Sequence, residues 1–398
     1  MGRGHINVHF KEITGYMDPE PALKNRMERW RKPGLYSSIS QFMLILAMTS
    51  SRKGPCAEAF TRHVTSSPEL PDYRYGIFRY PDSVEKKFID TLRDARRGTE
   101  TSTLPSVRII PALTPLSFRG NSPLEQVADV AGFVRRFTHD LPTMAAGLLY
   151  SFLLTALLNE RSVAPAPLRK ALEVAESLAD TVETNSSSIF SMALNPDALK
   201  LELLNLSGAL RRIIPSGTKE TAEDIICSWI NRSLKTPITR ATVNIPPALL
   251  LHSLSLCTHL IDDSRLMFRA AAEGGAAASL TAMTGVIAAC ILGPAIVPET
   301  LVRNLVNRKK IISQVDTLAG DAVPSERIVD FIRSEASLTA KEQAELRARL
   351  KHARKKPKKH KVTRKEKETE LTRHVVESWT KIDKAKWKKE RKLRDKNR

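Results

Sequence analysis

Hydrophobic residues recur at three- and four-residue steps along most of the chain, which is the spacing of one face of an α-helix. This spacing, with prolines at first-turn positions, predicts helices at residues 42–51, 55–64, 83–97, 123–137, 143–159, 165–184, 196–214, 218–233, 245–260 and 264–273. Only residues 106–110, between two prolines, have the character of an extended segment. No period of fixed length recurs, so a repeat solenoid is not indicated. The pattern predicts an all-α fold.

One apolar stretch, residues 273–297, differs from the rest. After Glu273 it holds twenty-four residues whose only ionisable group is Cys290. Large apolar side chains form one stripe and alanines keep the other faces small, which predicts a helix at the centre of a bundle. The stretch is also long enough to span a bilayer, but its small and hydroxylated residues favour the buried helix.

Length and composition limit the class of protein. The chain has 398 residues, 42% hydrophobic and 27% charged, enough to bury the core of one large domain or two small ones. Its four cysteines form no CxxC pair, which disfavours a disulfide framework or a zinc ribbon and favours a reducing compartment. The first residues lack a signal-peptide pattern. We expect a soluble intracellular protein without a membrane partner, cytoplasmic, or organellar if the organism is eukaryotic.

Four short motifs occur in order along the chain. They are Ser37-Ser38-Ile39-Ser40-Gln41 before the apolar residues 42–48, Ser106-Val107-Arg108-Ile109-Ile110-Pro111, Phe137-Thr138-His139, and Gly274-Gly275-Ala276-Ala277-Ala278-Ser279 followed by Gly293-Pro294. Serines before an apolar periodic segment are a helix-start signal. Together the motifs resemble those of the ADP-ribosylglycohydrolase family over roughly residues 1–305. The resemblance implies an orthogonal bundle of helices at residues 1–310. Beyond it, the residues themselves predict a helical extension at 311–353 and a basic tail at 354–398.

The resemblance also implies where a metal site would lie. The family binds a catalytic magnesium pair through acids in a Thr-Asp-Asp-Thr-Gln element and in a Gly-Gly-Asp-Thr-Asp-Thr element. The matching positions here are Ser37, Ser38, Ile39, Ala276, Ala278 and Ser279, none of which is a carboxylate. Magnesium prefers carboxylate and other oxygen ligands that offset its charge. We therefore expect the magnesium pair to be absent and no other cofactor to replace it. The family's opening helix and its glutamate have no counterpart, either because they are lost or because the start is assigned too late.

Other positions of the resembling motifs could line a ligand cleft. For an ADP-ribose-like ligand they are Ser40, Gln41, Arg108, His139, Gly274 and Gly275. Two of them have local alternatives: Arg108 would hold either a phosphate or an acidic side chain, and His139 either borders the cleft or follows a Thr138 helix cap.

Two further groups carry metal-binding residue types. Asp262 and Asp263 precede a helix, so capping is favoured over a metal role. His252, Cys257 and His259 are favoured as packing residues over zinc ligands, because four convergent ligands are not visible.

The C-terminal part is strongly basic. Residues 325–353 predict one or two helices that leave the core. Residues 351–398 then hold 21 Lys and Arg against 7 Asp and Glu, which is most of the formal net charge of +20. The nucleic-acid candidates are Lys355, Lys356, Lys358, Lys359, Trp379 and Trp387, and the two tryptophans share one helical face. Basic side chains among aromatics favour contact with RNA or a ribonucleoprotein. A protein partner or no specific role remain alternatives.

These observations support two hypotheses. The first is a catalytically impaired relative of ADP-ribosylglycohydrolases that acts as a binding or scaffold module, with a basic tail on RNA or another polyanion. The second is an ADP-ribosyl glycohydrolase with an atypical site, in which His139 would be nearly the only candidate base.

Overall fold

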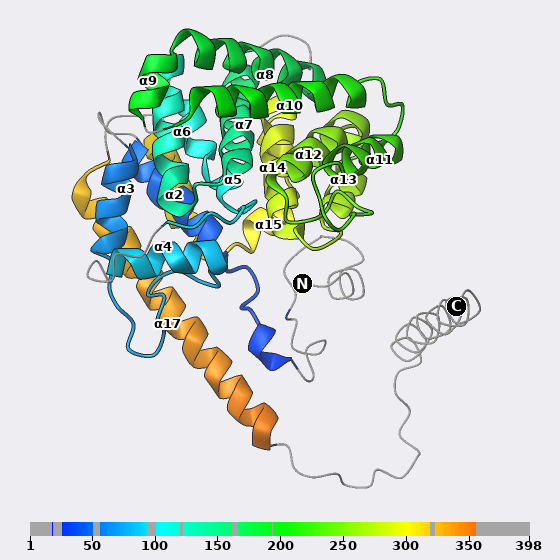
Figure 1. Ribbon diagram of the computed structural model, residues 1–398. Coiled ribbons are helices and arrows are strands. Elements are labelled where there is room, and N and C mark those ends of the chain that lie inside the picture. Colours follow the sequence, from blue (N-terminus) through cyan, green and yellow to red (C-terminus); the bar gives the residue numbers. More distant parts are fainter. Residues whose placement is uncertain are drawn as a thin grey trace, which may run out of the picture. The chain divides into compact units, whose positions relative to one another are not determined.

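A computed structural model describes residues 18, 26–50, 56–93, 101–119, 122–160, 166–192, 194–318 and 323–355. Their regular structure is helical apart from two isolated β-bridges, so the predicted all-α fold is confirmed (Figure 1). The α-helices are α2 (Ser38–Ser50), α3 (Cys56–Thr65), α4 (Ser83–Arg93), α5 (Ile109–Ala112), α6 (Pro123–Phe137), α7 (Leu141–Asn159), α8 (Pro167–Thr184), α9 (Ser186–Ser191), α10 (Pro196–Ile213), α11 (Lys219–Ile230), α12 (Pro246–Leu260), α13 (Ser264–Ala271), α14 (Ala277–Leu292), α15 (Glu299–Arg303), α16 (Arg308–Leu318) and α17 (Ser325–Lys355). Short 3-10 helices are η2 (Met27–Arg29), η4 (Thr114–Phe118) and η5 (Pro294–Ile296).

Helices begin where the sequence carries capping residues. The Ser122 hydroxyl accepts a hydrogen bond from the backbone N–H of Glu125 at the start of α6, and the Glu125 carboxylate accepts one from the Ser122 N–H. Asn195 caps α10 in the same position, and proline occupies the first turn of α6, α7, α8, α10 and α12. Each helix predicted between residues 42 and 273 is present, with ends within a few residues of the prediction.

The centre of the bundle is α7, not the helix expected there. Helix α7 contacts α5, α6, α8, α10, α12, α14 and η4, and most of its side chains are buried. Helix α14 does form within residues 273–297, but one of its faces is open, with Ala278 exposed and Leu292 50% exposed. The prediction failed because α14 has neighbours on only part of its circumference. Among the described helices, α7 is long and apolar enough to span a bilayer, and 67% of its apolar window is buried inside the fold, as in a core helix.

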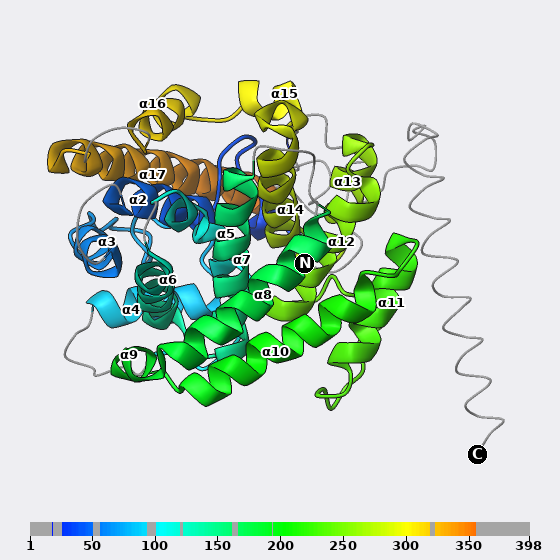
Figure 2. The same ribbon diagram turned by 90° about the horizontal axis from the view of Figure 1, so that it is seen from above.

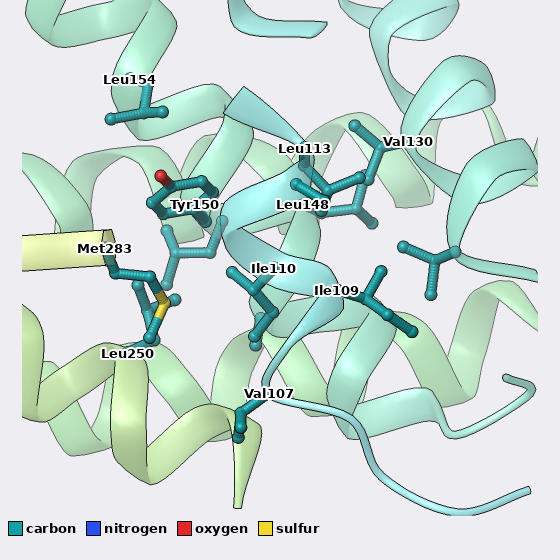
Figure 3. Close-up of a cluster of buried hydrophobic side chains, with 14 of the residues drawn as sticks. Val107, Ile109, Ile110, Leu113, Val130, Leu148, Tyr150, Leu154, Leu250 and Met283 are labelled. Carbon is teal, nitrogen blue, oxygen red and sulfur yellow. The ribbon is translucent and has the colours of Figure 1, made fainter. Parts of the chain in front are cut away.

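The segment expected to be extended is instead the turn that leads into α5. Figure 3 shows Ile109, Ile110 and Leu113 of this region among buried side chains that come from several helices, including Leu250 of α12 and Met283 of α14. A strand at this position would have no neighbouring strand to satisfy its backbone groups, whereas a helical turn satisfies part of them internally. Burial of its apolar residues between α2, α7 and α14 therefore outweighs the local β preference.

Helix α17 is one continuous helix, and its first half belongs to the core. Ile328, Phe331 and Ile332 are at most 3% exposed and join the main hydrophobic cluster, so the expectation that this segment leaves the core is wrong for these residues. Figure 2 shows α17 lying alongside α2. Residues through Arg347 form one compact unit, and those from Ala348 form a second. Of the second unit only residues 348–355 are described, and they continue the helix. Among the predicted nucleic-acid residues, Lys356, Lys358, Lys359, Trp379 and Trp387 lie outside the described residues.

Candidate functional site

The serine motif lies at the start of α2, where the sequence predicts it. The Ser38 N–H donates to the Arg79 carbonyl over 2.8 Å, and its side chain is fully buried. The Ser38 hydroxyl donates to Oε2 of Glu85 (2.7 Å) and accepts from Nη2 of Arg108 (2.9 Å). Ile39, the next residue, is buried in the hydrophobic core. Both positions that resemble metal-binding acids are therefore committed to contacts within the protein.

Glu85, which no sequence motif indicated, is the carboxylate of this cluster. It comes from the first turn of α4, is 1% exposed, and lies 3.2 Å from Nε of Arg108. Burial raises the pKa of Glu85 to about 7, against the opposing effect of the Arg108 charge. Arg108 also donates to the carbonyl oxygen of Tyr80. Two partners were considered for Arg108, a phosphate and an acidic side chain, and the structure places it against an acidic side chain.

A second polar cluster joins Gln41 to α17. The carboxylate of Glu335 accepts from Nε2 of Gln41 (2.9 Å), Nη2 of Arg79 (2.6 Å), the Tyr36 hydroxyl and Nδ2 of Asn307. The Arg79 and Glu335 side chains are both 0% exposed. The Gln41 carbonyl oxygen accepts the Arg79 N–H over 2.9 Å. The only residue of the serine motif that matches the family element by identity is thus bound to the C-terminal helix.

Two more residues of α17 extend this contact along the helix. Thr339 bonds to Nη1 of Arg79 and to the Ile77 carbonyl, and Glu342 accepts the Lys32 N–H over 2.9 Å. Both are 0% exposed. Positions 335, 339 and 342 lie on one helical face, so α17 carries a buried polar stripe.

The glycine-alanine motif forms the start of α14. Gly274 has φ +90°, and a Cβ there would lie 2.1 Å from Oγ1 of Thr242, so only glycine fits. The Ala276 N–H donates to the Thr242 carbonyl, and Ser279 is buried. Helix α5 contacts both α14 and α2, but within the described residues no hydrogen bond or ion pair joins the two motifs. In that same part of the chain, no three His, Cys, Asp or Glu side chains converge as metal ligands would.

Comparison with known protein families gives one decisive match, since the profile described as ADP-ribosylglycohydrolase covers residues 3–328. The chain belongs to the ADP-ribosylglycohydrolase family. Among curated proteins no sequence matches it. The family match includes the serine motif and the glycine-alanine motif and ends at Ile328, so Glu335, Thr339 and Glu342 of α17 lie beyond it.

Within the family-matched region, His139 is exposed and lies in the short connection between α6 and α7. The expected cap by Thr138 is wrong: Thr138 is buried and donates to the Leu104 carbonyl, and Asp140 caps α7 by accepting from the Thr143 N–H (2.9 Å). An aspartate directly before Leu141-Pro142 was a signal that could have revealed this cap.

Three of the metal-binding residue types named from the sequence have partners within the fold, whereas Nδ1 of the buried His252 has no hydrogen-bond partner in the described part of the chain. Asp263 caps α13 by accepting from the Leu266 N–H, as expected. Cys257 is buried and donates to the Thr284 carbonyl, whereas His259 lies near the Ser216 hydroxyl. Burial lowers the pKa of His252 to about 4, so this side chain is neutral at pH 7.

A cavity of about 510 Å³ adjoins the His139 connection. It is lined by the starts of α7 and α12, one face of α10 and the end of α11, including Asp140, Glu202, Asn205, Trp229, Arg232 and Pro246. Burial, and then the charge of Asp140, raise the pKa of Glu202. Sequence reasoning missed Glu202, Asn205, Trp229 and Arg232, because each lies on an ordinary amphipathic helix or its end, with no motif around it.

Proposed function

We propose that this member of the ADP-ribosylglycohydrolase family is catalytically impaired and acts as a binding or scaffold module. The observation that carries the proposal is the engagement of Ser38 by Glu85 and Arg108. A guanidinium 2.9 Å from the Ser38 hydroxyl supplies a fixed positive charge at a position that resembles a metal-binding acid. A divalent cation beside it would meet like charge without a free carboxylate in compensation.

The donor set therefore does not fit a magnesium pair. Glu85 is the one carboxylate in contact with Ser38, and its raised pKa and its pairing with Arg108 make it a poor magnesium ligand. Alanines at positions 276 and 278 add no donor from the second motif.

The test is release of ADP-ribose from an ADP-ribosylated protein, with and without magnesium, alongside calorimetry with ADP-ribose. We expect no magnesium-dependent release and no effect of magnesium on ligand binding. A variant that restores acids at Ser38, Ile39, Ala276 and Ala278, combined with Arg108→Ala, should gain a magnesium-dependent rise in melting temperature that the wild type lacks. Magnesium-dependent turnover by the wild type would refute the proposal.

The proposed partner of the basic segment is RNA or another polyanion. Its support is the charge of residues 351–398, with 21 basic and 7 acidic side chains and two tryptophans. In gel-shift titrations, replacing Lys355, Lys356, Lys358 and Lys359 with glutamine should weaken RNA binding and reduce the salt slope by up to about 3, since each phosphate contact on a single strand contributes about 0.7.

Two exposed lysines of α16, Lys309 and Lys310, provide the control when changed to glutamine. Unchanged affinity in the tail variant, or RNA binding that does not depend on salt, would instead favour a protein partner or no specific role.

The second candidate is hydrolysis of ADP-ribosyl bonds by an atypical site, and Glu85 is the observation that favours it. A carboxyl with a pKa of about 7 suits general acid or base catalysis, and Glu85 accepts a hydrogen bond from Ser38 of the serine motif. Its exposure of 1% argues against direct access to a substrate. Glycohydrolase activity that is abolished by Glu85→Gln or His139→Ala would establish this alternative.

A further inference from the structure

The polar side chains that line the cavity between α7, α10, α11 and α12 differ from those of the serine and arginine motifs in whether they have partners. At the motifs, the side chains of Ser38, Gln41 and Arg108 are engaged by partners within the fold. At the cavity, in the described part of the chain, the side chains of Glu202 and Asn205 make no hydrogen bond or ion pair. Unengaged polar groups around a cavity are what a ligand site offers before binding.

From this arrangement we infer that the cavity binds a basic side chain of a protein segment, with its ammonium or guanidinium group between the carboxylates of Glu202 and Asp140. The inference rests on the proposed binding role but not on the loss of catalysis. The family motifs do not include these residues, since Glu202 lies on α10 and Asp140 directly follows the motif Phe137-Thr138-His139.

The charges of the lining select a cation. Oδ2 of Asp140 accepts hydrogen bonds from the Thr143 N–H and hydroxyl, and the negative charge of Asp140 acts on Glu202, which lines the same cavity. A cation between the two carboxylates would relieve that repulsion. Arg232, which is exposed, is the one basic side chain of the lining, so the cavity carries more negative than positive charge. A phosphate-bearing ligand would meet both carboxylates and is disfavoured.

The walls suit an aliphatic stem with a charged end. Pro105, Pro142 and Pro246 line the cavity, and the half-buried indole of Trp229 adds an aromatic surface. Lysine and arginine place their methylene groups on such surfaces while the charged end reaches polar groups. An indole face also attracts a cation directly.

The surroundings of the cavity favour a protein segment over a free amine. Leu104, Leu201 and Leu204 are 55%, 59% and 45% exposed, and each is next in sequence to a lining residue. Large apolar side chains that are this exposed would pack on the neighbours of the bound basic residue. A small amine would leave them in water, so it would gain less on binding.

The experiment titrates the full chain with a fluorescein-labelled peptide of sequence Leu-Ala-Lys-Ala-Leu, blocked at both ends, and follows fluorescence anisotropy. We expect saturable binding that weakens about tenfold with Glu202→Gln, the loss expected for one charge-assisted hydrogen bond. Asp197→Asn is the matched control, because it removes the same charge from an exposed position on the same helix and should leave affinity unchanged.

Three further probes decide the ligand class. The same peptide with glutamine for lysine should bind at least about tenfold more weakly, and 1,5-diaminopentane should compete only at much higher concentration than unlabelled peptide. Equal binding of the lysine and glutamine peptides, or equal loss in the Glu202→Gln and Asp197→Asn variants, would overturn the inference. Displacement of the peptide by ADP-ribose at lower concentration than by the amine would also overturn it, in favour of a nucleotide. None of these outcomes affects the magnesium-dependent hydrolysis assay, so the two proposals fail separately.

Discussion

Replacing Glu335 with alanine should strongly destabilise the protein. The change removes an acceptor that four side chains share and leaves the Arg79 guanidinium without its carboxylate at 0% exposure. An uncompensated buried charge costs about 3–5 kcal/mol of unfolding free energy. That loss corresponds to a change of about two to nearly four orders of magnitude in the folding equilibrium.

Urea unfolding followed by far-ultraviolet circular dichroism measures the free energy. Glu345→Ala is the control, since Glu345 lies on the same helix and pairs with Lys32 at 2.9 Å, but its side chain is 34% exposed. An ion pair with that exposure contributes about 0–1 kcal/mol. If Glu335→Ala costs no more than Glu345→Ala, the polar stripe does not hold α17 in place and the reasoning is wrong.

A double replacement separates the charge pair from the shape of the site. Arg79→Met with Glu335→Leu fills the space with apolar groups, so it should recover much of the loss caused by either single change. A double variant whose cost equals the sum of the single costs would show that the two side chains do not act as a pair.

Three more predictions follow from particular residues. Folding raises the pKa of Glu85 from 4.5 to about 7, so the native state binds this proton more tightly than the unfolded state does. The unfolding free energy of the wild type should therefore fall by about 3 kcal/mol relative to that of Glu85→Gln as pH rises from 4.5 to about 7, and by no more above that pH. Parallel pH–stability curves for the two proteins would contradict this. Gly274→Ala should cost well over the roughly 1 kcal/mol expected for Gly293→Ala, because both glycines have positive φ but only the first would bring a Cβ against Thr242, and chemical denaturation of the pair checks it. Burial raises the pKa of all four cysteine thiols, so none should react rapidly with Ellman's reagent at pH 7.5 until the protein unfolds.

The candidate site was only partly readable from the sequence. The helix start at Ser38 and the absence of acids at positions 276 and 278 can be recognised in the sequence, since capping signals and ligand types are local properties. The partners of Ser38 are not, because Glu85 and Arg108 lie 47 and 70 residues away along the chain. Glu335 lies 294 residues from Gln41, on a helix whose polar stripe looks in sequence like a solvated face.

The sequence by itself determined most of the longer helices and, within a few residues, their ends, because hydrophobic period, proline position and capping residues act within a few residues of one another. It did not indicate the short helices α5, α9 and α15. It also determined membership of the family, and it shows no acid at positions 38, 39, 276 and 278. Only the tertiary structure decided that α7 rather than α14 is central, that α17 returns to the core, and that a cavity lies beside His139. These features depend on which surfaces meet after folding, and a buried ion pair such as Arg79–Glu335 is recognisable only when both partners and their loss of solvent are known.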